Sequence, residues 1–108
     1  MLTRELAIKI VIEFINKLQC EGIDIQKAIL FGSYANNCQN EWSDIDLALV
    51  SDSFTGFGFN DKSSFAKINS QKPYSIIQTK TYPTNYFDQG DPFIDQIKKT
   101  GIVLFQNN

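Results

Sequence analysis

The sequence predicts an α/β fold in which about four short strands form a small sheet flanked by helices. Three observations support this prediction: an amphipathic helical stretch begins the chain, two short apolar runs follow it, and a capped helical stretch precedes a last apolar run. With 108 residues, the chain is expected to form a single domain, residues 1–108, around one modest core.

The first helix is predicted over residues 3–20. Apolar residues recur every four positions and give this segment one broad apolar face: Leu6, Ile10, Phe14 and Leu18. Thr3 is a suitable N-cap because its hydroxyl can accept a hydrogen bond from the first turn, and Gly22 is placed to end the helix.

Two buried strands are predicted next, over residues 28–31 and 45–50. The first is a short apolar run that ends abruptly at Gly32, and the second is apolar on both faces apart from Asp46. A short helix is expected between them, over residues 33–39, followed by a polar turn.

The next segment is predicted as a loop, a short helix and a third strand. Glycine and phenylalanine alternate in the loop, and residues 61–68 suggest a helix with Phe65 and Ile68 facing the core. Residues 74–81 are rich in β-forming side chains and predict the third strand, which Pro83 ends.

The last segment is predicted as a helix followed by a strand. Asp91 is a suitable N-cap, Pro92 fits the first helical position, and Gly101 follows the last turn. The apolar run over residues 102–105 then predicts the fourth strand.

Composition excludes several classes of function. The chain contains no histidine, so histidine-based triads and nearly every zinc site are excluded, and a bound metal would be a hard cation held by carboxylates. The net charge of −2 gives no basic footprint for duplex nucleic acid, and no apolar run is long enough to span a membrane. The N-terminus is typical of an amphipathic helix and not of a signal peptide, so a cytoplasmic location is expected.

One constellation of residues points to chemistry. Gly32 and Ser33 follow a buried strand, where free backbone N–H groups can accept a phosphate, and Tyr34 next to them is expected either to line a pocket or to pack in the core. Ten residues separate Ser33 from Asp44, and Asp46 follows two positions later, so both carboxylates should point to one side of a strand. Two such charges side by side call for a counter-ion, and a metal is the obvious one.

This arrangement resembles the signature of the minimal nucleotidyltransferases of the polymerase-beta superfamily. The resemblance covers residues 5–50 and extends to the helix and strand near the C-terminus. It implies a mixed β-sheet flanked by helices, a nucleoside triphosphate donor such as ATP, and two Mg²⁺ ions, or Mn²⁺ in their place. By that resemblance Gly32 and Ser33 bind the triphosphate, and Asp44 and Asp46 are the catalytic residues that ligate the metal.

The sequence departs from this family pattern in one respect. The family supplies a third carboxylate from the strand predicted at residues 74–81, but residues 63–87 contain neither aspartate nor glutamate. Gln78 is the expected occupant of that position and a candidate nucleotide-binding residue, with Asp61 and Asp88 as less favoured substitutes from loops. A neutral amide is a poorer metal ligand and cannot act as a base, which puts turnover in doubt more than nucleotide binding.

Two functions follow from the resemblance. The first is an enzyme that transfers a nucleoside monophosphate, AMP from ATP, to a hydroxyl of a protein or small molecule, as the antitoxin of a toxin–antitoxin pair. The second is a catalytically weak module that binds nucleotide and neutralises a small helical HEPN-type partner by binding alone.

Overall fold

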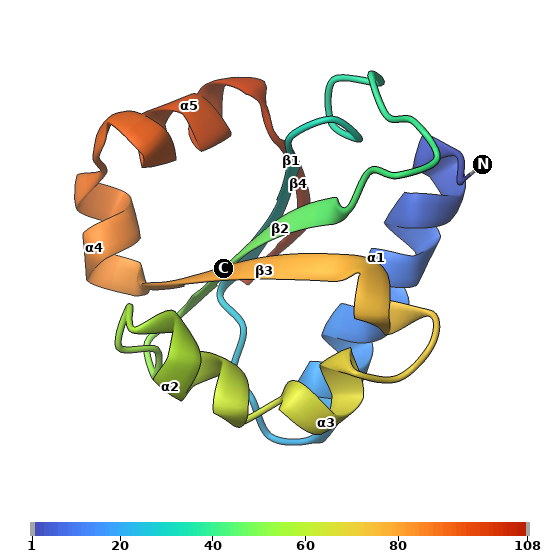
Figure 1. Ribbon diagram of the computed structural model, residues 1–108. Helices are drawn as coiled ribbons and strands as arrows, with labels where there is room; N and C mark the ends of the chain where they lie inside the picture. Colours follow the sequence, from blue (N-terminus) through green and yellow to red (C-terminus); the bar gives the residue numbers. More distant parts are fainter. Residues whose placement is uncertain (1, 108) are drawn as a thin grey trace.

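The computed structural model describes residues 2–107 and contains one four-stranded sheet with helices on both faces (Figure 1). Its elements follow in this order: α1 (Arg4–Cys20), β1 (Lys27–Phe31), β2 (Ile45–Ser51), α2 (Gly58–Ser63), α3 (Ala66–Asn69), the 3-10 helix η1 (Tyr74–Ile76), β3 (Ile77–Pro83), α4 (Thr84–Gln89), α5 (Pro92–Thr100) and β4 (Ile102–Gln106).

The sheet is mixed, with the strand order β3-β2-β1-β4. Strand β1 pairs antiparallel with both β2 and β4, whereas β2 pairs parallel with β3. The predicted small mixed sheet of four strands flanked by helices is therefore confirmed.

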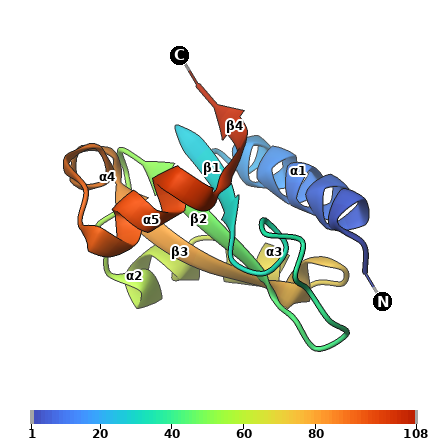
Figure 2. The ribbon, with the colours of Figure 1, turned by 90° about the horizontal axis from the view of Figure 1, so that it is seen from above.

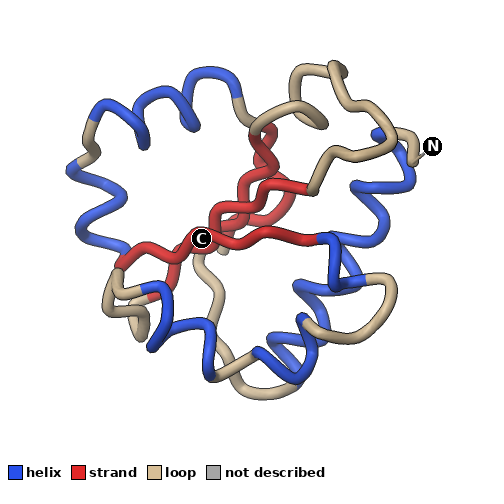
Figure 3. Tube along the Cα trace, in the orientation of Figure 1, coloured by secondary structure: helices blue, strands red, loops and turns tan. Residues whose placement is uncertain are grey.

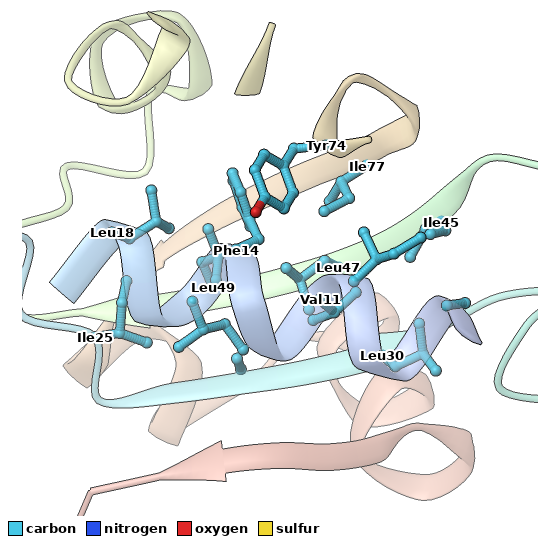
Figure 4. Close-up of a cluster of buried hydrophobic side chains, with 14 of the residues drawn as sticks. Val11, Phe14, Leu18, Ile25, Leu30, Ile45, Leu47, Leu49, Tyr74 and Ile77 are labelled. Atoms are coloured by element: carbon cyan, nitrogen blue, oxygen red, sulfur yellow. The ribbon is translucent and has the colours of Figure 1, made fainter. Parts of the chain in front are cut away.

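The larger part of the core lies between α1 and one face of the sheet. Thr3 caps α1 by accepting a hydrogen bond from the Leu6 amide at 3.2 Å, as predicted. Leu6 itself is 47% exposed, and the buried face of the helix is formed instead by Ala7, Ile10, Val11, Phe14, Ile15 and Leu18. Figure 4 shows Val11, Phe14 and Leu18 against strand residues that include Leu30, Leu47 and Leu49.

A smaller apolar cluster lies on the opposite face of the sheet, under α4 and α5. Its buried members are Ile29, Ala48, Val50, Phe87, Ile94 and Ile97. Helix α5 begins at the predicted cap, because the Asp91 carboxylate accepts a hydrogen bond from the Ile94 amide at 2.7 Å, and it lies across the sheet near β1 (Figure 2). Because side chains alternate along a strand, Asp46 belongs to this second face of the sheet, two positions before Ala48.

In the middle of the chain, two predicted elements differ from the structure and one helix was not predicted. The helix expected over residues 61–68 is two short helices, α2 and α3, separated at Phe65, whose backbone is not helical and whose ring is buried against Phe14. The third strand begins at Ile77, because residues 74–76 form η1, and it includes Pro83. Helix α4 was not predicted at all. Within residues 2–107, no helix is both long and apolar enough to cross a membrane.

Candidate functional site

The connection that leaves β1 forms a turn at Gly32 and Ser33. Gly32 has a φ of +76°, a left-handed conformation that glycine adopts without strain. One turn of helix-like hydrogen bonding follows, with the Asn36 amide donating to the Gly32 carbonyl at 3.1 Å and the Cys38 amide donating to the Ser33 carbonyl at 2.8 Å.

The short helix predicted over residues 33–39 is wrong, because the whole connection between β1 and β2 is loop (Figure 3). The left-handed φ of +57° at Asn37 explains the difference, since a right-handed helix cannot continue through that conformation.

The turn leaves three consecutive backbone donors available. Within residues 2–107, no backbone carbonyl accepts a hydrogen bond from the amides of Ser33, Tyr34 or Ala35. Free amides at the first positions of a helical turn favour an anion such as a phosphate. The turn therefore has the donors that a phosphate-binding loop requires, although its one turn is shorter than the predicted helix.

Asp46 is brought against this turn by the pairing of β1 with β2. It is the second residue of β2 and pairs with Phe31, the residue directly before Gly32. A Cβ atom added to Gly32 would overlap the Asp46 carboxylate. Only glycine at this position allows the backbone turn and the carboxylate to approach so closely, and this contact joins the two halves of the sequence motif.

The charges around Asp46 are coupled to one another. Burial raises the pKa of Asp46, the Asp44 carboxylate raises it further, and the Lys80 ammonium partly offsets both effects by lowering it. Asp44 lies exposed immediately before β2. The charge of Asp44 therefore acts on Asp46, and the Lys80 ammonium on β3 is close enough to act on Asp46 as well.

Strand β3 brings Gln78 beside Asp46. The two residues are partners in the parallel pairing of β2 with β3, and paired positions point to the same face of a sheet. Lys80 follows on the same face, and both side chains are exposed. Tyr74 does not share this face, although it belongs to the segment predicted as the third strand: it lies in η1, is buried in the larger cluster, and donates its hydroxyl to Glu13 at 3.1 Å.

Comparison of the sequence with known protein families identifies the family of this chain. The model of the family described as "Polymerase beta, Nucleotidyltransferase" matches residues 11–108 of the chain. The chain belongs to this family. No curated protein matches it with statistical significance.

Solved structures with the same fold include other nucleotidyltransferase-like chains. A candidate nucleotidyltransferase from Sulfolobus solfataricus superposes with a TM-score of 0.69 at 13% identity, covering 96% of this chain and 84% of that one. A chain from a toxin–antitoxin crystallised with AMP-PNP gives a TM-score of 0.61 at 23% identity, covering 89% of this chain and 73% of that one. A chain from a mutant of the toxin–antitoxin MntA-HpeT superposes with a TM-score of 0.56 at 18% identity, covering 89% of this chain and 72% of that one.

In this polymerase-beta family chain, Asp61 and Asp88 do not supply a third carboxylate beside Asp44 and Asp46. Within residues 2–107, no group of three or more aspartate, glutamate, cysteine or histidine side chains is placed to hold a metal ion. Asp61 is buried and accepts hydrogen bonds from the Thr81 hydroxyl at 2.7 Å and from the amides of Thr55 and Gly56. Because Thr81 faces away from Gln78 and Lys80, Asp61 serves the opposite side of the sheet. Asp88 lies exposed on α4.

Tyr34 lies in the core. It is 2% exposed and belongs to the larger apolar cluster, although burial and then the charge of Asp44 raise the pKa of its hydroxyl. Of the two expectations for this residue, core packing therefore describes its position.

A cavity beside Gly32 is not indicated by any pattern in the sequence. This cavity, of about 270 Å³, lies between the end of β1, the following turn and α5, and is lined by Phe31, Gly32, Asn36, Phe93, Gln96, Ile97 and Thr100. The amphipathic pattern of residues 92–100 predicts a helix, but it does not predict that Phe93 and Gln96 face the turn after β1.

Proposed function

We propose that this chain binds a nucleoside triphosphate, ATP, and transfers its nucleoside monophosphate to a hydroxyl group. The observation that carries this proposal is the contact between Gly32 and Asp46, which joins a turn with free amides to a pair of carboxylates. The turn at Gly32 and Ser33 would hold phosphate oxygens through backbone N–H groups, and the carboxylates would hold the counter-ion that phosphates require.

The residues fit a divalent metal. Asp44 and Asp46 offer carboxylate oxygens, which Mg²⁺ and Mn²⁺ prefer; burial and then the Asp44 charge raise the pKa of Asp46, and Lys80 offsets this only in part. A bound Mg²⁺ would neutralise charge on the phosphates and on the departing pyrophosphate. The family resemblance implies two ions, whereas the described residues offer only two clustered carboxylates.

In the proposed reaction, the acceptor oxygen forms a bond to the α-phosphorus of ATP, and the bond from that phosphorus to the pyrophosphate oxygen breaks. The acceptor hydroxyl must also lose its proton. Gln78 stands beside Asp46 and is a neutral amide, so it cannot take that proton. We therefore expect slow transfer, with a protein or a small molecule as the acceptor.

The proposed biological role is that of an antitoxin. Two structurally similar chains come from toxin–antitoxin complexes, one of them crystallised with AMP-PNP and the other carrying glutamate in place of two aspartates that lie two positions apart. The parent of that mutant therefore contains two aspartates with the same spacing as Asp44 and Asp46. By analogy, the partner proposed for this chain is a small helical protein of the HEPN type.

A second function is favoured by the position of Gln78. A site that binds nucleotide and lacks a base would neutralise its partner by binding, with little or no transfer. Detectable release of pyrophosphate favours the enzyme, and stoichiometric inhibition of the partner without transfer favours the binding module.

The test is a calorimetric titration of the protein with ATP, with and without Mg²⁺, followed by a transfer assay with ATP labelled at the α-phosphate. We expect binding that depends on Mg²⁺ and that Asp44→Asn and Asp46→Asn each abolish, while thermal unfolding shows that both variants stay folded. Asp52→Asn, at an exposed position outside the site, is the matched control. If both site variants bind ATP as the parent does, the assignment of the metal site is wrong.

A further inference from the structure

The cavity beside Gly32 adjoins the proposed phosphate site. Gly32 lines the cavity, and the same residue meets the Asp46 carboxylate. A ligand whose phosphates lie at the turn would therefore have this cavity directly beside it. The remaining walls come from β1 and α5, which belong to the packed body of the protein.

The side chains of the cavity are aromatic, apolar or amide. The rings of Phe31 and Phe93 meet edge to face, with their centroids 5.8 Å apart and their planes at 89°. Phe93 is nevertheless 47% exposed, so part of its ring remains open to a ligand. An exposed aromatic ring beside a polar rim is the usual platform on which proteins stack a nucleic-acid base.

Two amide side chains line the cavity, Asn36 from the turn after β1 and Gln96 from α5. Asn36 donates its amide N–H to the Gly32 carbonyl at 3.1 Å, which fixes the side chain and leaves its oxygen as an acceptor. Gln96 is exposed on α5 and carries both a donor and an acceptor. Asparagine and glutamine match the paired donor and acceptor of adenine, whereas guanine is matched best by arginine or lysine. No lining residue of the cavity is charged.

Lys80 links the cavity to the acidic site. Its ammonium lies 5.4 Å from the centroid of the Phe93 ring and also lowers the pKa of Asp46. Phe93 is thus held between the cavity and the strand that carries Gln78. A nucleotide with its base at Phe93 would place its phosphates toward Gly32, Lys80 and Asp46.

We propose that the cavity lined by Phe31, Asn36, Phe93 and Gln96 is the base-binding subsite for the adenine of the nucleoside triphosphate. This proposal rests on the proposed function, because it assumes that the phosphates lie at Gly32 and Ser33. Adenine stacks on Phe93, and the amides of Asn36 and Gln96 bond its polar edge.

The experiment compares two probes, ATP and inorganic tripolyphosphate, by calorimetry in the presence of Mg²⁺. Loss of base stacking costs roughly 10- to 100-fold in affinity, so Phe93→Ala should weaken ATP binding by that factor and leave tripolyphosphate binding within about twofold of the parent. Phe93→Leu keeps apolar bulk without the aromatic face, and should weaken ATP binding in the same direction. Phe59→Ala is the control, since Phe59 is 89% exposed on α2 and should affect neither probe.

Base preference gives a second measurement. The parent should bind ATP at least about fivefold more tightly than GTP, and Gln96→Leu should reduce that ratio toward one. Melting temperatures of all variants establish that they remain folded.

The outcomes separate the subsite from the proposed function. If Phe93→Ala and Phe93→Leu bind ATP as the parent does, while Asp46→Asn does not bind it, the phosphate site stands and the base lies elsewhere. If the parent binds neither ATP nor tripolyphosphate with Mg²⁺, both the proposed function and the subsite fail.

Discussion

Replacing Gln78 with aspartate should strengthen metal binding and raise transfer activity. Gln78 is the partner of Asp46 in the parallel pairing of β2 and β3, and both residues face the same side of the sheet. Gln78→Asp would place a third carboxylate beside Asp44 and Asp46. The change adds one negative charge and a group that can accept a proton.

The magnitude follows from the spacing of neighbouring strands. Adjacent strands lie about 4.8 Å apart, so two carboxylates on paired residues are separated by roughly 5 Å. Two unit charges at that distance repel by about 1–3 kcal/mol for an effective dielectric constant between that of water and that of a protein surface. Gln78 is exposed, so solvent screening favours the lower end, about 1 kcal/mol.

This repulsion should be visible in two ways. Without metal, Gln78→Asp should lower the melting temperature by about 4–8 °C, the shift that 1 kcal/mol produces in a domain of this size. A divalent cation relieves the repulsion, so Mg²⁺ should bind at least about fivefold more tightly than to the parent. Transfer to the acceptor should rise by about 10²-fold or more, because general-base assistance is worth ~10²–10⁴-fold in rate.

The assay combines calorimetric titration with Mg²⁺ and a transfer assay with labelled ATP in the presence of the natural partner. Gln71→Asp, which adds the same charge at an exposed turn position, is the control and should change neither measurement. Unchanged Mg²⁺ affinity in Gln78→Asp would mean that position 78 does not face the metal. Vigorous transfer by the parent that falls in the variant would show that the third ligand has been misplaced.

Three further predictions test the fold around the site. Asp46→Asn should make the metal-free protein more stable at pH 7. Burial and then the Asp44 charge raise the pKa of Asp46, so folding favours the protonated carboxyl over the ionised one. The ionised form therefore costs stability above the pKa of the unfolded state, and this cost vanishes as the pH falls below that pKa. The melting-temperature difference between variant and parent should therefore shrink from pH 7 to pH 3, and a variant that is less stable at pH 7 contradicts the reasoning. Asp61→Asn should lower the free energy of unfolding, measured in urea titrations, by roughly 3–6 kcal/mol. Two of the four donors that now bond to the Asp61 carboxylate would face an amide N–H, at a cost of about 1.5–3 kcal/mol each. The control Asp52→Asn should cost far less. Gly32→Ala should lower folding stability by about 1–2 kcal/mol because of the left-handed φ alone. It should also weaken Mg²⁺ binding, because the new Cβ atom displaces the Asp46 carboxylate. Unchanged Mg²⁺ affinity would argue against that contact.

Helix ends and strand positions could be predicted wherever local chemistry decides them. Thr3 and Asp91 cap their helices through side-chain oxygens, and this depends only on residues within one turn. The apolar runs that became β1 and β2 were also recognisable, because both strands are covered on their two faces. These local signals were sufficient for the order of the four strands and for helices α1 and α5.

Longer-range packing decided the segments that were predicted wrongly. Residues 74–76 have the composition of a strand, but the Asn69 side chain donates to the carbonyls of Tyr74 and Ile77, at 2.9 and 3.2 Å, and fixes a 3-10 turn there. Phe65 interrupts a helix because its ring enters the core beside Phe14. Neither partner can be identified from local propensity.

The candidate site, too, was predictable only in part. The spacing of Gly32, Ser33, Asp44 and Asp46 indicated a site because both halves of the motif lie at the ends of neighbouring strands. Gln78 was expected near the aspartates from the family resemblance, and the parallel pairing of β3 with β2 places it beside Asp46. The cavity at Phe93 and Gln96 was not predictable, because it depends on where α5 crosses the sheet.

Two aspartates in this protein differ in the direction of their pKa shifts, because hydrogen bonds surround one of them and a like charge lies near the other. Burial alone would raise the pKa of Asp61, but hydrogen bonds from Thr55, Thr81 and Gly56 outweigh it and lower the pKa, so the ionised form stabilises the fold. Within residues 2–107, no hydrogen bond lowers the pKa of Asp46 in this way, and its raised pKa means that the ionised form destabilises the metal-free fold. Asp46 lies against Gly32 and is repelled by Asp44, and Lys80 only partly offsets these effects, so a bound cation would stabilise the ionised form further. Aspartate therefore holds a loop in place on one face of the sheet, and on the other face it supplies a carboxylate of the metal site that we propose.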